Sequence, residues 1–150
     1  MIKKIFILYF LFLFGCNYQP IYLNKNLENL QFYQITQLGD KKINKAILSS
    51  TNLKEDKTDK NLNELFITST YVIEETSLSS KKTVQTYNSK IVVNLQIKQD
   101  EKVLRTRNFV KEFNYDNKEI KFELTKYQNK IKNNLLNSIT EEIILYLNIK

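Results

Sequence analysis

The chain has 150 residues, with 23 lysines and arginines against 16 aspartates and glutamates, and a formal net charge of +7. It contains no histidine, one cysteine and two glycines. The commonest general base and transition-metal ligand is therefore missing, a zinc site built on paired cysteines is excluded, and there is no glycine-rich phosphate loop. We expect a binding protein, with no enzymatic activity and no cofactor.

The chain begins with the parts of an export signal. Lys3 and Lys4 precede an apolar run over residues 5–14, which ends at the small residue Gly15. A transmembrane helix needs about 20 apolar residues, and this run is about half as long. We therefore predict a signal peptide over residues 1–15 that is removed from the mature chain.

The single cysteine follows this run directly. Leu13, Gly15 and Cys16 resemble the lipobox of bacterial lipoproteins, in which the cysteine is acylated after cleavage. This resemblance implies lipid attachment, palmitate among the acyl groups, at Cys16, and Asn17 is compatible with passage to the outer membrane. The alternative is a free cysteine in a signal peptide that is cut elsewhere.

Two short elements open the rest of the chain. A lipidated tether is predicted over residues 16–28, followed by a single domain over residues 29–150. Alternating apolar residues at 30–35 predict a first strand. Asp40 is suited to cap a helix, in which Ile43, Ala46, Ile47 and Ser50 recur at helical spacing.

The middle of the chain predicts strands. Residues 51–60 are almost free of apolar side chains and predict a solvated loop. Apolar and β-branched residues alternate over 62–74, 84–98 and 103–115, which predicts three strands in two antiparallel hairpins. One face of the second of these strands is expected to be apolar through Ile91, Val93, Leu95 and Ile97.

The last segment predicts a long amphipathic helix from residue 119 onward. One apolar stripe recurs every three or four residues, formed by Leu124, Tyr127, Ile131, Leu135, Ile139, Ile143 and Leu147. We expect this stripe to pack on the sheet, the alternative being a helix that lies on a membrane. The fold class is therefore predicted as α+β, a two-layer sandwich with a four-stranded, mostly antiparallel sheet and two helices on one face.

A basic cluster marks the last strand and is the candidate ligand-binding site, formed by Lys102, Arg105, Arg107 and Lys111. Strict alternation places Arg105, Arg107 and Lys111 on one side, where they could meet the phosphates of a lipid headgroup. Three apolar residues share that nominal side, which indicates a bulge or a register change: Val103, Phe109 and Phe113. The alternative is an ordinary solvated sheet face.

Neighbouring carboxylates occur at Glu74 and Glu75 and at Glu141 and Glu142. Adjacent residues on a strand or helix do not point at one another. Neither pair is therefore expected to form a catalytic dyad.

Several segments together resemble the LPS-assembly lipoproteins (LptE), alphaproteobacterial type. These segments are the lipobox with residues 16–22, in which Pro20 and Tyr22 match, the Gly39 and Asp40 pair with its lysine-rich helix, and the long helix over 122–147. The resemblance implies an outer-membrane lipoprotein that lodges in the LPS-translocating barrel LptD, assists the assembly of that barrel and binds lipopolysaccharide. Two alternatives remain open: a free-standing periplasmic lipoprotein that binds a ligand or inhibits an enzyme, and a hydrolase whose site the sequence does not reveal.

Overall fold

The computed structural model describes residues 30–148. Along the chain lie β1 (Gln31–Phe32), β2 (Gln34–Gly39), α2 (Lys41–Thr51), β3 (Lys54–Glu55), β4 (Glu64–Leu78), β5 (Val84–Gln99), β6 (Lys102–Asp116) and α3 (Lys121–Asn148). The predicted signal peptide, Cys16 and the tether lie outside the described residues. Within residues 30–148, neither helix combines the length and the apolar character that a membrane crossing requires.

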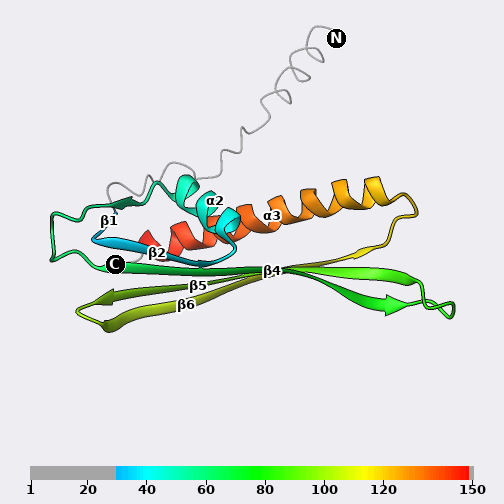
Figure 1. Ribbon diagram of the computed structural model, residues 1–150, viewed down its shortest axis with the longest axis horizontal. Coiled ribbons are helices and arrows are strands. Elements are labelled where there is room, and N and C mark those ends of the chain that lie inside the picture. Colours follow the sequence, from blue (N-terminus) through cyan, green and yellow to red (C-terminus); the bar gives the residue numbers. More distant parts are fainter. Residues whose placement is uncertain (1–29, 149–150) are drawn as a thin grey trace, which may run out of the picture.

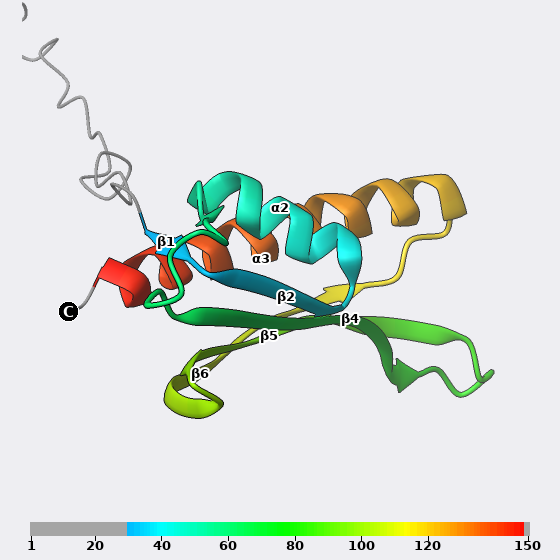
Figure 2. The same ribbon diagram turned by 60° about the vertical axis from the view of Figure 1, so that its left-hand side comes forward.

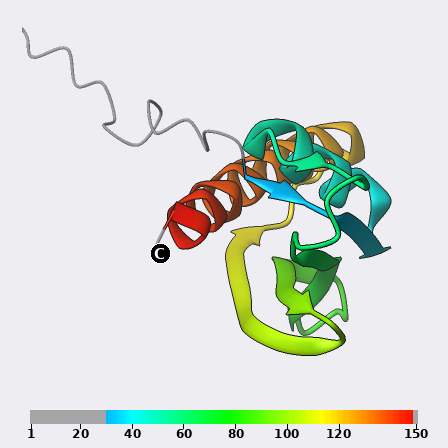
Figure 3. The ribbon, with the colours of Figure 1, turned by 90° about the vertical axis from the view of Figure 1, so that its left-hand side faces the viewer.

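The main sheet has the strand order β2-β4-β5-β6. β2 runs parallel to β4, whereas β4 with β5 and β5 with β6 are antiparallel. Both helices cover the same face of this sheet (Figure 1), and the end-on view of Figure 3 shows the opposite face uncovered. The predicted α+β sandwich is therefore confirmed.

The first strand and the following loop differ from the prediction. The expected strand is interrupted at Tyr33, whose N–H donates to the carbonyl of Asn63 at 2.8 Å. β1 pairs instead with β3, inside the segment predicted as a loop. The helix also extends into that segment, because the Thr51 hydroxyl is buried and donates to the carbonyl of Ile47 at 2.8 Å. Hydrogen bonds formed inside the fold, which apolar periodicity does not report, therefore set these boundaries.

The turn from β2 into α2 depends on Gly39 and Asp40. Gly39 has φ +81°, and a Cβ at this position would lie 2.0 Å from the carbonyl oxygen of Ser69. The Asp40 carboxylate accepts hydrogen bonds from the N–H groups of Lys42 at 2.9 Å and Ile43 at 3.1 Å. The predicted helix cap is confirmed.

The core fills the space between the helices and the sheet. The stripe of α3 faces the sheet as predicted, with Ile139 and Ile143 fully buried and Leu124 and Tyr127 partly buried. The inward side chains of the sheet include Leu65, Ile67, Ile91, Val93, Leu95, Ile97 and Phe109. α2 adds Ile43 and Ile47, while Ser50, expected on its apolar side, is exposed.

A bulge interrupts the pairing of β5 with β6. Ile97 lies opposite Arg105, but the next residue, Lys98, lies opposite Val103, so Leu104 is the additional residue. Val103 therefore lies on the face of Lys98, and Arg105 lies on the opposite, helix-covered face. The predicted irregularity in this strand is confirmed.

Candidate functional site

Three of the four predicted basic residues share the helix-covered side of β6. Arg105, Arg107 and Lys111 lie opposite Ile97, Leu95 and Ile91, whose side chains are buried beneath the helices. Because cross-strand partners point to the same face, the three cationic side chains point toward α3. The predicted common side is therefore present, and it borders the helix.

The Arg105 side chain forms a hydrogen bond with the carboxyl end of α3. Its Nη2 atom donates to the carbonyl oxygen of Tyr146 at 3.1 Å. The last four carbonyls of a helix have no partner within it, and the last turn of α3 contains no basic residue. Arg105 therefore brings from β6 the positive charge that a helix carboxyl end favours.

Arg107 approaches the same aromatic ring from a more exposed position. The guanidinium carbons of Arg105 and Arg107 lie 4.4 Å and 5.3 Å from the ring centroid of Tyr146. This ring is buried and packs edge-on against Phe109, with centroids 5.7 Å apart. We call Arg105 and Arg107 the arginine pair. Two planar donor groups beside one another provide the chemistry to bind a phosphate or carboxylate.

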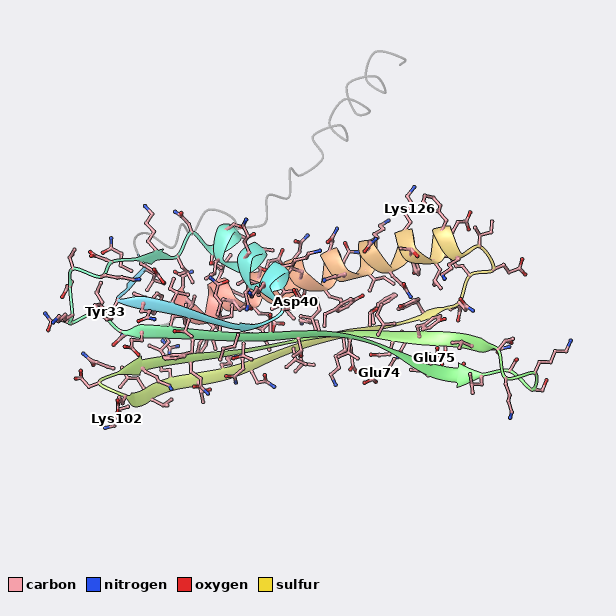
Figure 4. All side chains as sticks on the ribbon, viewed as in Figure 1. Tyr33, Asp40, Glu74, Glu75, Lys102 and Lys126 are labelled. Carbon is pink, nitrogen blue, oxygen red and sulfur yellow. The ribbon has the colours of Figure 1, made fainter. Side chains whose placement is uncertain are left out.

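The other two basic residues of the cluster, Lys111 and Lys102, have different surroundings from the arginine pair. Lys111 forms an ion pair with Glu142 on α3. Lys102 is exposed at the tip of the β5 and β6 hairpin (Figure 4). The arginine pair is therefore the part of the predicted cluster in which two cationic side chains lie against the same ring.

A hollow of about 360 Å³ lies where β6 ends and α3 begins. The Lys118 ammonium lies 5.0 Å from the centroid of the Tyr127 ring. Aromatic rings and amide groups face the same space, and the lining is Thr86, Phe113, Asn114, Tyr115, Asp116, Asn117, Lys118 and Tyr127. The contribution of Tyr127 from α3 follows only from the fold.

The buried polar side chains near this hollow have structural partners. The Ser89 hydroxyl lies between the Tyr71 and Tyr115 hydroxyls, at 3.2 Å and 3.1 Å. Burial raises the pKa of the Tyr71 hydroxyl, against an opposing effect of its hydrogen bond to Ser89. Tyr71 is therefore a neutral hydrogen-bonding group at ordinary pH. Residues 30–148 hold no cluster of side chains that could bind a metal ion.

The uncovered sheet face is largely polar, with few charged side chains in its middle rows. Register assigns to it five rows across β4, β5 and β6: Phe66, Gln96 and Thr106; Thr68, Asn94 and Asn108; Thr70, Val92 and Val110; Val72, Lys90 and Glu112; Glu74, Asn88 and Asn114. We call these rows the open face. Within these rows Lys90, Glu112 and Glu74 are charged, and the first two form an ion pair at 3.6 Å. The same face continues to Glu64 and Lys98 at one end of the sheet and to Asp116 at the other.

Comparison with solved structures finds the same fold in proteins that are named as lipoproteins. Rare lipoprotein B from Shewanella oneidensis matches with a TM-score of 0.59 and 11% identity, over 76% of this chain and 92% of that structure. A minor lipoprotein from Acinetobacter baumannii gives 0.53 and 12%, over 77% and 90%. Lipoprotein B from Nitrosomonas europaea gives 0.50 and 10%, over 76% and 82%. At these identities the likeness shows a shared fold.

The sequence comparisons add no family assignment. No protein-family model matches the chain, and no curated protein sequence matches it.

Proposed function

We propose that this chain is an outer-membrane lipoprotein anchored through Cys16, which serves as the plug subunit of a lipopolysaccharide translocon. In this role it lodges in the barrel protein LptD, assists assembly of that barrel and binds lipopolysaccharide without enzymatic turnover. The lipobox, the resemblance to the LPS-assembly lipoproteins and the fold shared with rare lipoprotein B support this proposal.

The open face is the observation that carries the proposal. Its threonine, asparagine and glutamine side chains offer hydrogen-bond donors and acceptors, with few charges that would have to be desolvated on contact. A barrel lumen presents such a polar wall, since the residues that face it alternate with apolar residues facing lipid. The open face therefore suits a partner that surrounds the sheet side of the molecule.

We assign lipopolysaccharide binding to the arginine pair, and we expect Lys102 and Lys111 to make further contacts with the same ligand. Arg107 is exposed, so its guanidinium remains accessible beside the Tyr146 ring. Changing both arginines to glutamate would also remove the hydrogen bond from Arg105 to α3. A loss of binding could then not be separated from a loss of folding. Arg107→Glu alone is therefore the informative change.

The binding test compares Arg107→Glu with Lys126→Glu. Both variants make the same charge change on an exposed residue, and Lys126 lies toward the opposite end of α3 (Figure 4). We expect Arg107→Glu to weaken lipopolysaccharide binding about tenfold and to reduce its dependence on salt, while Lys126→Glu changes little. Equal affinities of the two variants would remove the arginine pair from the site.

The hollow favours one other function, a free-standing periplasmic lipoprotein that binds a small ligand or inhibits an enzyme. Its aromatic and amide lining suits a sugar ring. Depletion of the chain separates the two candidates. A plug subunit is expected to leave LptD misassembled when it is depleted, whereas loss of a free-standing binder is expected to leave LptD intact.

A further inference from the structure

β4 is unpaired on one side over the second half of its length. β2 accompanies it only from Glu64 to Ser69, and β2 ends at Gly39 opposite Ser69. From residue 70 to residue 78, β4 pairs only with β5 among the described residues. Figure 2 shows β2 leaving the sheet midway along β4 to enter α2.

The backbone on this side is available for hydrogen bonding. The Ser69 carbonyl points toward β2, because it accepts from the N–H of Asp40 at 2.9 Å. Backbone groups alternate in direction along a strand, so those of Tyr71, Ile73 and Glu75 point to the same open side. The stretch from 70 to 75 offers about 20 Å of strand before the bulges that follow Glu75.

Residues 70–75 of this edge lack the lysine, arginine and proline residues that often prevent strand addition. β4 contains no lysine, arginine or proline between Glu64 and Leu78. The other free edge, β6, carries Arg105, Arg107 and Lys111. The two sheet edges therefore differ in their capacity to accept another strand.

The charges on the β4 edge select the kind of strand. Glu74 and Glu75 point to opposite sides of β4 (Figure 4), and no lysine or arginine of residues 30–148 lies within ion-pair distance of either carboxylate. Val72 and Ile73 are exposed beside them, at 44% and 39%. A strand placed here would thus meet one carboxylate and one apolar side chain on each face.

We propose that residues 70–75 of β4 bind an extended segment of another protein, which adds a strand to the sheet and carries lysine or arginine among apolar residues. The added strand would occupy the position that β2 vacates, with backbone hydrogen bonds to Tyr71 and Ile73. Its basic side chains would pair with Glu74 and Glu75. This interaction does not depend on the lipopolysaccharide site or on the identity of the barrel partner.

The test uses the full chain in detergent and a fluorescent seven-residue peptide in which two adjacent lysines are flanked by valines, so that one lysine side chain lies on each face of the added strand. We expect binding, and we expect a matched peptide with glutamate in place of lysine to bind at least tenfold more weakly. Glu74→Lys combined with Glu75→Lys should reverse this preference. Glu101→Lys, a charge change of the same sense in the β5 and β6 turn, is the control and should leave it unchanged.

Ile73→Pro tests the strand geometry itself. It removes an N–H that faces the open side and leaves the pairing with β5 intact, and an edge strand tolerates proline at such a position. We expect it to weaken peptide binding at least tenfold. If this variant does not fold, hydrogen exchange in the unchanged chain gives the answer, because the added strand should slow exchange of the Tyr71 and Ile73 amides.

Three results would overturn the proposal. These are no binding of the lysine peptide, binding without slower exchange at Tyr71 and Ile73, and occupation of the edge by a second copy of the chain. The last would appear as a dimer of the unchanged chain that Ile73→Pro converts to a monomer.

Discussion

At the scale of single residues, the junction between β2 and α2 decides where the first helix begins. Gly39 is held against the backbone of Ser69, and Asp40 satisfies the first N–H groups of α2. The Asp40 carboxylate also lies 3.5 Å from the Lys132 ammonium, which ties this junction to α3. Two adjacent residues therefore fix both the helix start and its position against the second helix.

Gly39→Ala should destabilise the chain strongly. The new Cβ would meet the Ser69 carbonyl at 2.0 Å and would hold an L-residue at φ +81°. We expect a loss of about 3 kcal/mol in the free energy of unfolding, measured with urea. A Gly39→Ala chain as stable as the original would contradict the close backbone approach.

Asp40→Ala should cost about 1 kcal/mol through loss of the cap. Burial raises the pKa of Asp40, but hydrogen bonds from Ile43 and Lys42 and the nearby Lys132 charge outweigh it, so the pKa lies below the usual 3.8. A lowered folded-state pKa stabilises the fold above the unfolded-state pKa, and this stability is lost as pH falls through the folded value. Urea unfolding should therefore show the difference between the two chains near neutral pH and a smaller difference below pH 3.8. A difference that grows toward low pH would contradict this assignment.

The cap at Asp40 could be predicted because a capping residue and its helix are local in sequence. The burial of the Asn44 side-chain amide could not be predicted in this way. Its Nδ2 group donates to the Leu38 carbonyl at 2.8 Å, while its buried Oδ1 atom has no hydrogen-bond partner among residues 30–148. In the sequence, a polar residue next to Ile43 is expected on the solvated side of the helix. Asn44 is buried because β2 lies beside it and accepts its hydrogen bond.

At the scale of elements, α3 is the longest helix of residues 30–148, with 28 residues, or about 42 Å. Its apolar stripe was readable because a period of three to four residues persists through the whole segment. The strands were readable from alternation for the same reason. What alternation did not give is the direction of the basic face of β6, because inward and outward sides depend on which face α3 covers.

Arg105→Ala should loosen the carboxyl end of α3. The change removes a charge-assisted hydrogen bond to the Tyr146 carbonyl and a cation–π contact with the Tyr146 ring. We expect a loss of about 1 kcal/mol, since the side chain is only half-buried. Arg107→Ala removes ring contacts alone and should cost about half as much. Urea unfolding of both variants checks this order, and the reverse order would contradict the role of Arg105.

At the scale of the whole molecule, one face of the sheet builds the core and the other remains free. The helices use the apolar side of β4 and β5, and the open face presents polar side chains with few charges. The sequence predicted this division, since strands with one apolar and one polar side need only one covering layer. It could not predict that β2 would stop halfway and leave half of β4 as a free edge.

Attachment to the membrane is predicted to occur through Cys16 alone. Mass spectrometry of the membrane-bound protein should find an acylated cysteine as the first residue. A Cys16→Ser chain made without residues 1–15 should be free of the membrane and should unfold cooperatively, because residues 30–148 form a core of their own. An unmodified Cys16 thiol, or a first residue at another position, would contradict the lipobox assignment.

Co-purification of the lipidated chain with the outer-membrane barrel tests the proposed plug function most directly. The contact is expected through the open face, so Asn94→Lys together with Asn108→Lys, which places two charges in one row of that face, should abolish recovery of LptD with the chain. Asn129→Lys together with Asn133→Lys, which adds the same two charges at exposed positions of α3, is the matched control and should retain it. Equal recovery of LptD with both variants would contradict the role of the open face, and no LptD with the unchanged chain would contradict the plug function itself.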